Sequence, residues 1–123
     1  MKRVLVVDDD EMNLKVARFI LEQNGYAVIT ASSGMECLSI LKNIFVDLIL
    51  LDVEMPIMSG IRTLENIRRQ EELHSIPVMF LTADAYTDTV MAAGRLNVAG
   101  YIKKPYLFDD FLERVEKVIH QND

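Results

Sequence analysis

The stretch LILLDVEMPIMSG, residues 48–60, joins a fully apolar run to an acid at its end. Residues 48–51 are continuously apolar, which is typical of a strand that is covered on both faces of a parallel sheet. The run stops at Asp52, and Pro56 and Gly60 follow in a segment predicted to be a loop. The pattern therefore predicts that a buried strand carries a carboxylate to the edge of its sheet.

Similar apolar runs recur along the chain and alternate with segments of helical periodicity. We expect strands at residues 4–7, 27–31, 48–51, 78–81 and 101–102. We expect helices at residues 11–24, 34–44, 60–70, 86–96 and across the stripe Phe108, Phe111, Leu112, Val115, Val118 and Ile119. Gly25 and Asn97 stand where helices should end. Five alternating units with short connections predict an α/β fold, with a parallel sheet and helices on both faces.

Length and composition limit the possible functions. The 123 residues, half of them hydrophobic, are the size of one domain, which we place at residues 1–123. A net charge of −6 argues against direct binding to nucleic acid or to an anionic membrane surface. A single cysteine, Cys37, excludes an internal disulfide and fits the reducing cytosol, so we expect a cytoplasmic protein. No run approaches the roughly 20 apolar residues of a membrane span.

Polar residues follow four of the expected strands, and all four strand ends meet at one edge of a parallel sheet. Asp8 and Asp9 follow the first strand, Asp52 the third, Thr82 the fourth and Lys104 the fifth. Two like charges 4 Å apart repel by about 4 kcal/mol at a surface-type dielectric, so three clustered carboxylates raise one another's pKa values or need cations. Lys104 supplies one positive charge, and oxygen ligands of this kind suit a partly hydrated Mg²⁺.

Each of these residues alone has an ordinary structural explanation. An acid after a strand is usually a helix cap, and we assign that role to Asp10. Their joint occurrence at successive strand ends instead favours phosphoryl transfer. A carboxylate can attack phosphorus and form an acyl phosphate. Positioning and charge neutralisation, by a metal, a lysine and a hydroxyl, provide most of the catalysis in such reactions.

With these motifs in place, the sequence resembles the receiver domain of bacterial two-component response regulators, apparently as a single-domain, CheY-like chain. The resemblance rests on VLVVDDD, LLDVEMPIMSG, the LTA after the fourth strand and the KP after the fifth. It implies a flavodoxin-like (βα)₅ fold, a three-layer sandwich around a five-stranded parallel sheet of order 2-1-3-4-5.

The resemblance also implies the roles of the acidic residues. Asp52 would be the phosphoacceptor that becomes an aspartyl phosphate. Asp9 and Asp52 would bind Mg²⁺ together with the backbone carbonyl of Glu54, and Asp8 would help to hold the ion. Glu54 and Asp84 occupy positions that vary in the family, and both are acidic here.

Further residues are assigned by the same resemblance. Lys104 would pair with the phosphoryl group, and Thr82 would donate a hydrogen bond to it and move toward it. Tyr101 would be a switch aromatic, although a half-buried strand tyrosine is the plain structural alternative. Pro105 would follow a cis peptide bond, and Gly60 would shape the loop beside the ion.

The implied function is that of a two-component or phosphorelay response regulator. A sensor histidine kinase or a histidine phosphotransfer protein would donate the phosphoryl group to Asp52. The change would be read by a downstream protein on the face of the fourth helix, fifth strand and fifth helix. The chain would catalyse its own phosphorylation and dephosphorylation without being an enzyme for another substrate.

Other functions fit parts of the pattern. The chain could be a receiver fragment of a larger regulator or of a hybrid kinase. An Mg²⁺-dependent phosphatase with an aspartyl nucleophile would carry its acid on the first strand and would need a cap region. A flavin or nucleotide binder would need a Gly-rich loop where this chain has DDDEMN. A receiver-like module without phosphorylation would lack one of the key residues, and none is missing.

Overall fold

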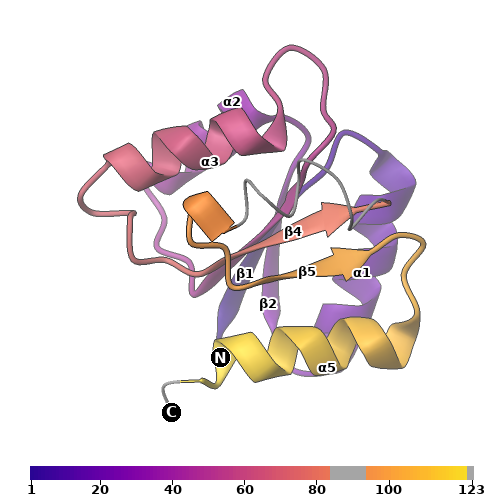
Figure 1. Cartoon of the computed structure of the whole chain (residues 1–123). Coiled ribbons are helices and arrows are strands. Elements are labelled where there is room, and N and C mark those ends of the chain that lie inside the picture. The colour runs from indigo at the N-terminus through magenta and orange to yellow at the C-terminus, as the bar shows by residue number, and fades with distance from the viewer. Residues whose placement is uncertain (84–93, 122–123) are drawn as a thin grey trace.

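The computed structural model describes residues 1–83 and 94–121, in which a five-stranded parallel sheet lies between two layers of helices (Figure 1). The strands are β1 (Arg3–Val7), β2 (Ala27–Ala31), β3 (Leu48–Asp52), β4 (Val78–Thr82) and β5 (Gly100–Lys103). The described helices are α1 (Glu11–Gln23), α2 (Gly34–Leu41), α3 (Gly60–Arg69) and α5 (Phe108–Ile119). The strand order is β2-β1-β3-β4-β5, which confirms the expected flavodoxin-like sheet.

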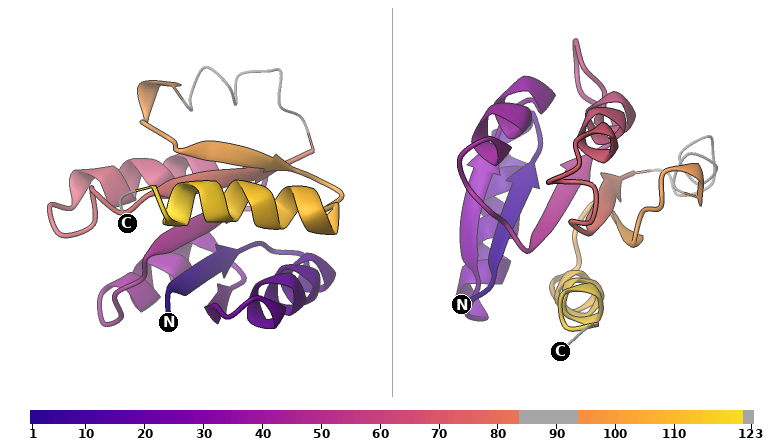
Figure 2. Two further views of the ribbon diagram at one scale, coloured as in Figure 1. Left: turned by 90° about the horizontal axis from the view of Figure 1, so that it is seen from below. Right: turned by 90° about the vertical axis from the view of Figure 1, so that its left-hand side faces the viewer.

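Successive residues of the central strands face opposite layers of the molecule. In β3, Ile49 and Leu51 pack with residues of α2 and α3, whereas Leu48 and Leu50 pack with residues of α1 and α5. In the left view of Figure 2, α5 lies in front of the sheet and α3 behind it. Because both faces are covered, an uninterrupted apolar run is what a central strand of this sheet requires.

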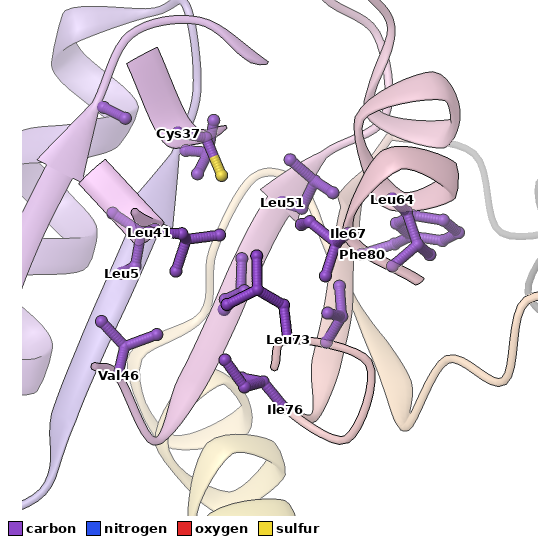
Figure 3. Packing of buried hydrophobic residues seen from close by; sticks show 14 of the residues in the cluster. Leu5, Cys37, Leu41, Val46, Leu51, Leu64, Ile67, Leu73, Ile76 and Phe80 are labelled. Carbon is purple, nitrogen blue, oxygen red and sulfur yellow. The ribbon is translucent and has the colours of Figure 1, made fainter. Parts of the chain in front are cut away.

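The core on the α2 and α3 side is continuous from the first strand to the fourth (Figure 3). The buried side chains labelled there are Leu5, Cys37, Leu41, Val46, Leu51, Leu64, Ile67, Leu73, Ile76 and Phe80. Cys37 is fully buried among them, and burial raises the pKa of its thiol to about 12. Cys37 is therefore a small apolar core residue, because a neutral thiol is a poor nucleophile.

The helix starts follow the expected capping chemistry. The Asp10 carboxylate accepts hydrogen bonds from the amides of Met12 and Asn13, which confirms Asp10 as the cap of α1. The expectation for α2 was wrong at its end, because the helix stops at Leu41 rather than at residue 44. The chain leaves the helix there, and Val46, two residues before β3, is fully buried in the core.

Three residues in the described part of the chain have a positive φ angle, and the sequence predicts two of them. Gly25 and Asn97 adopt positive φ angles of 87° and 56°, as their positions after helices predict. Ile57 also has a positive φ, 68°, in the loop between β3 and α3. A β-branched residue is strained in this conformation, and the Ile57 side chain is fully exposed.

Some expectations lie outside the described residues. Most of the helix expected at residues 86–96 falls there, as does Asp84, although residues 94 and 95 are helical. No helix in the described ranges combines the length and apolar character that crossing a membrane requires.

Gly60 is required by a close approach between the start of α3 and the end of β3. A Cβ atom at this position would collide with the main-chain carbonyl group of Asp52. The Gly60 amide also donates a 2.9 Å hydrogen bond to the Val53 carbonyl oxygen, which ties the helix to the chain just beyond Asp52. The glycine thus sets how tightly the loop folds back beside the strand end.

Replacing Gly60 by Ala should destabilise the protein by about 2–3 kcal/mol, because backbone must move to accept the methyl group. Urea denaturation measures this change. Gly94→Ala is the matched control, since a Cβ there meets no atom within 4 Å and alanine favours helix. Equal stability of the two variants would contradict the close contact.

Candidate functional site

The carboxyl ends of four strands bring the polar residues predicted at strand ends, together with Glu54, into one pocket of about 230 Å³, whereas Tyr101, Gly60 and Pro105 do not line it. Its walls come from the ends of β1, β3 and β4 and from the segment after β5. They consist of Asp8, Asp9, Asp10, Asn13, Asp52, Glu54, Thr82, Ala83 and Lys104. The strand-end residues therefore lie close together, as the sequence predicts.

Three carboxylates lie together in this pocket. Asp8, Asp9 and Asp52 each offer an oxygen, and these oxygens all lie within 4.8 Å of one another. Asp8 is fully buried and Asp52 is 4% exposed, whereas Asp9 faces solvent. Two buried acids of the same charge at this separation destabilise the folded state unless cations offset them.

Among the described residues, Lys104 provides the positive charge that lies between the two buried acids. Its Nζ lies 2.8 Å from Asp8 Oδ2 and 3.0 Å from Asp52 Oδ1. Burial lowers the pKa of Lys104, but the two carboxylates outweigh burial and the pKa rises above its ordinary value. One ammonium group therefore remains charged between two anions and leaves one negative charge uncompensated.

The pKa of Asp52 is raised to about 7. Burial is the main cause, Lys104 opposes the shift, and the neighbouring Asp8 adds to it. Without a further cation, the site therefore favours the protonated form of the Asp52 carboxyl group more than water does. A cation bound between the acids would favour the ionised form.

Main-chain groups hold the acids in place. The Asp10 amide donates a 2.9 Å hydrogen bond to Asp8 Oδ1, and the Glu54 amide donates a 3.3 Å bond to Asp52 Oδ1. The Lys104 amide donates to the Thr82 carbonyl oxygen at 2.8 Å, which joins the ends of β4 and β5. The carboxylates of Asp8 and Asp52 are therefore each held by an amide group two residues further along the chain.

Thr82 and Tyr101 lie next to this cluster but differ in environment. Thr82 is buried at the end of β4 and lines the pocket. Tyr101 is half-buried on β5, beside Phe80 in the sheet register, and packs against the core on the α2 and α3 side. The switch role of Tyr101 stays a prediction, while the peptide bond before Pro105 is cis as expected.

Two residues of the neighbourhood were not predicted from the sequence. Asn13 lines the pocket, and its position one turn into α1, after the Asp10 cap, could have indicated this. Tyr106 has a buried hydroxyl whose pKa is raised by burial and then by Asp8, Asp52 and Asp10. No local pattern distinguishes Tyr106 from a core aromatic, because its neighbours come from distant parts of the chain.

A larger cavity of about 500 Å³ lies between α1, the end of β2 and the start of α2. It shares Asp9 with the acidic pocket, but the remaining lining mixes two acids, two bases and two hydroxyl groups with one leucine. Strand ends bring no comparable set of like groups together there. The chemistry therefore belongs to the smaller pocket.

Comparison with known proteins gives a consistent result. The family model of the response regulator receiver domain matches residues 4–116. The polar-differentiation response regulator DivK of Brucella ovis is 33% identical over 118 residues, which are 96% of each chain. The chemotaxis protein CheY4 of Vibrio cholerae superimposes with a TM-score of 0.91 at 28% identity, covering 96% of this chain and 98% of the other. A CheY-like receiver domain protein from Methanospirillum hungatei gives 0.90 at 30% identity, covering 98% and 95%.

Replacing Asp52 by Asn should stabilise the metal-free protein at pH 8 by about 1–3 kcal/mol, because a neutral amide replaces a buried anion. The folded-state pKa of about 7 lies above the ordinary 3.8, so the ionised Asp52 lowers the stability of the wild type fully above pH 7. The stability difference between the two proteins should become smaller as the pH falls toward 4. Urea denaturation in EDTA across this range measures the difference.

Asp9→Asn is the control, since Asp9 is exposed and should respond less. An Asp52→Asn variant that is less stable than wild type at pH 8 would contradict the charge imbalance, as would a difference independent of pH.

Proposed function

The chain belongs to the response regulator receiver family, and we propose that Asp52 accepts a phosphoryl group from a phosphohistidine. The donor would be a sensor histidine kinase or a histidine phosphotransfer protein. The observation that carries the proposal is the buried Asp52 carboxylate, held at the end of β3 with Lys104 Nζ at 3.0 Å and two further acids beside it. This arrangement supplies a nucleophile and the charges that its reaction needs.

In the proposed reaction, an Asp52 oxygen attacks the phosphorus atom. The bond between phosphorus and the donor imidazole nitrogen breaks, the electron pair stays on the imidazole, and an acyl phosphate forms on Asp52. Lys104 already contacts Asp52 and would neutralise a phosphoryl oxygen. Thr82 lines the same pocket and would donate a hydrogen bond to that group.

The site fits a magnesium ion. Three carboxylates converge within 4.8 Å, and the Lys104 ammonium group, at 2.8 Å from Asp8 and 3.0 Å from Asp52, offsets only one of their negative charges. We expect Asp9, Asp52 and the main-chain carbonyl of Glu54 to bind the ion, with Asp8 assisting. All donors are oxygens, which suit Mg²⁺. When bound, the ion would supply positive charge to the phosphoryl oxygens and ionise Asp52.

The chain would act on itself rather than on a separate substrate. Asp52 is both the catalytic nucleophile and the group that is modified, and water would later hydrolyse the acyl phosphate in the same pocket. The protein would therefore be a phosphoacceptor that catalyses its own phosphorylation and dephosphorylation, and not an enzyme in the usual sense.

An exposed apolar stripe on α1 supports a docking role for the phosphodonor. Met12, Val16 and Phe19 are spaced at i, i+4 and i+7, and Met12 and Phe19 are 64% and 59% exposed. The stripe begins beside Asn13, which lines the acidic pocket. A donor protein that presents its phosphohistidine to Asp52 would contact the surface of α1 beside the pocket. We therefore assign the stripe to docking of the donor.

Output would use a different face. Phosphorylation adds about −1.5 to −2 charges at Asp52 and would draw in Thr82 and Lys104. Tyr101 would then turn inward and change the surface formed by β5, α5 and the fourth helix, for a downstream protein. The fourth helix lies largely outside the described residues.

Incubation with acetyl phosphate and Mg²⁺ should add one phosphoryl group that hydroxylamine removes. Asp52→Asn should reduce labelling at least a hundredfold, because an amide is a poor nucleophile. EDTA should have a similar effect on the wild type. Intact-protein mass spectrometry measures both. Equal labelling of the Asn variant would disprove the assignment of Asp52.

The donor is chosen from a panel of purified, autophosphorylated histidine kinases as the one that labels the wild type fastest. Phe19→Ala should slow phosphotransfer from this kinase about tenfold. Acetyl phosphate labelling should not change, because α1 would contact only the protein donor. Phe45→Ala is the matched control, since Phe45 is also exposed, at 69%, but precedes β3 at the opposite edge of the sheet. Equal slowing of phosphotransfer by both variants would contradict the assignment of α1 to donor docking.

A further inference from the structure

The acidic pocket has a buried floor and an exposed mouth. Asp8, Asp52 and Thr82 are at most 4% exposed and form the floor, where the proposed nucleophile lies. Four further lining residues face solvent and form the mouth, namely Asp9, Asp10, Glu54 and Ala83. Phosphoryl transfer proceeds in line, so an attack from the floor expels the leaving group toward the mouth.

Asn13 and Lys104 line the same pocket and are half-buried, between its floor and its mouth. The Lys104 ammonium group is already engaged, at 2.8 Å from Asp8 and 3.0 Å from Asp52. The ionised acids of the mouth can only accept hydrogen bonds, and an alanine side chain does neither. Among the described residues that line the pocket above its floor, Asn13 is therefore the one whose side chain offers a free hydrogen-bond donor to a leaving group.

The main chain of Asn13 is fixed while its carboxamide is not engaged. Asn13 is the third residue of α1, and its main-chain amide donates a 3.3 Å hydrogen bond to Asp10 Oδ1. Within residues 1–83 and 94–121, the Asn13 carboxamide forms no hydrogen bond with another residue. Its NH₂ group carries two donors. They stand beside Met12, at the start of the stripe on α1 that we assign to donor docking.

We propose that Asn13 is a catalytic residue for the leaving group, whose carboxamide N–H donates a hydrogen bond to the imidazole nitrogen that the phosphorus atom leaves. The inference rests on the proposed function, because it concerns the phosphohistidine that donates to Asp52.

The step balances without a proton transfer to or from Asn13. An Asp52 oxygen forms the bond to phosphorus, and the phosphorus–nitrogen bond breaks. Its electron pair stays on the imidazole, whose other nitrogen keeps its proton. Before the transfer, the phosphorylated nitrogen has no free electron pair and cannot accept a hydrogen bond. The bond from Asn13 forms only as the phosphorus–nitrogen bond breaks, so it stabilises the transition state rather than the bound donor.

Two small phosphodonors with different leaving groups test the proposal without a partner protein. Phosphoimidazole releases imidazole, whereas acetyl phosphate releases acetate, whose bridging oxygen has free electron pairs before and after the transfer. In Mg²⁺, Asn13→Leu should slow labelling of Asp52 by phosphoimidazole about three- to tenfold, which is the effect of one neutral hydrogen bond. Labelling by acetyl phosphate should change by less than about twofold, because a hydrogen bond to its oxygen is present in both states. Intact-protein mass spectrometry measures both rates.

The ratio of the two rate constants is compared between proteins, so a variant that is partly unfolded remains informative. Asn13→Asp is isosteric and has no donor at pH 8, and the ratio of phosphoimidazole to acetyl phosphate labelling should fall in this variant as well. Asn66→Leu is the matched control. The Asn66 carboxamide donates to the Arg62 carbonyl oxygen on α3, away from the pocket, and the ratio should stay at its wild-type value.

An unchanged ratio in either Asn13 variant would overturn the proposal, since Asn13 would then treat both leaving groups alike. An equal fall in Asn66→Leu would overturn it too. If wild type is labelled on Asp52 by both donors and the Asn13 variants keep its ratio, only the role of Asn13 fails. If neither donor labels wild type, the phosphoacceptor assignment fails, and this inference fails with it.

Discussion

One ammonium group shared between two buried carboxylates is the interaction on which the site depends. Lys104 balances either Asp8 or Asp52 but not both, so the metal-free pocket holds one negative charge too many. This arrangement is costly for folding and favourable for binding, since any cation or protonated group that enters is attracted. The apolar layers on both sides of the sheet provide the stability that keeps such a pocket in place.

Most of the fold follows from short-range patterns in the sequence. Continuous apolar runs identify the strands, because both faces of this sheet are covered, and Asp10 marks the start of α1 by its capping chemistry. The site residues follow from one further rule, that parallel strands end at the same edge. Asp8, Asp52 and Lys104 are far apart in sequence, yet the rule alone brings them together.

The missed features depend on contacts between distant segments. The end of α2 is decided by Val46 entering the core, and the Tyr106 hydroxyl acquires its surroundings from acids at two other strand ends. The positive φ of Ile57 has no signal at all, since sequence rules expect glycine or asparagine in that conformation. Local sequence propensity cannot predict such features, because they depend on tertiary contacts that form only in the folded chain.

The position of β3 in the middle of the sheet has a consequence for local unfolding. β3 is paired with β1 on one side and β4 on the other, and each of its residues is buried. Amides in such a strand exchange with solvent only when most of the domain opens, whereas loop amides exchange through small fluctuations. We therefore expect the Asp52 amide to exchange slowly and the amides of the loop carrying Ile57 to exchange faster. Fluctuations of that loop alter the surroundings of the carboxylate without displacing it.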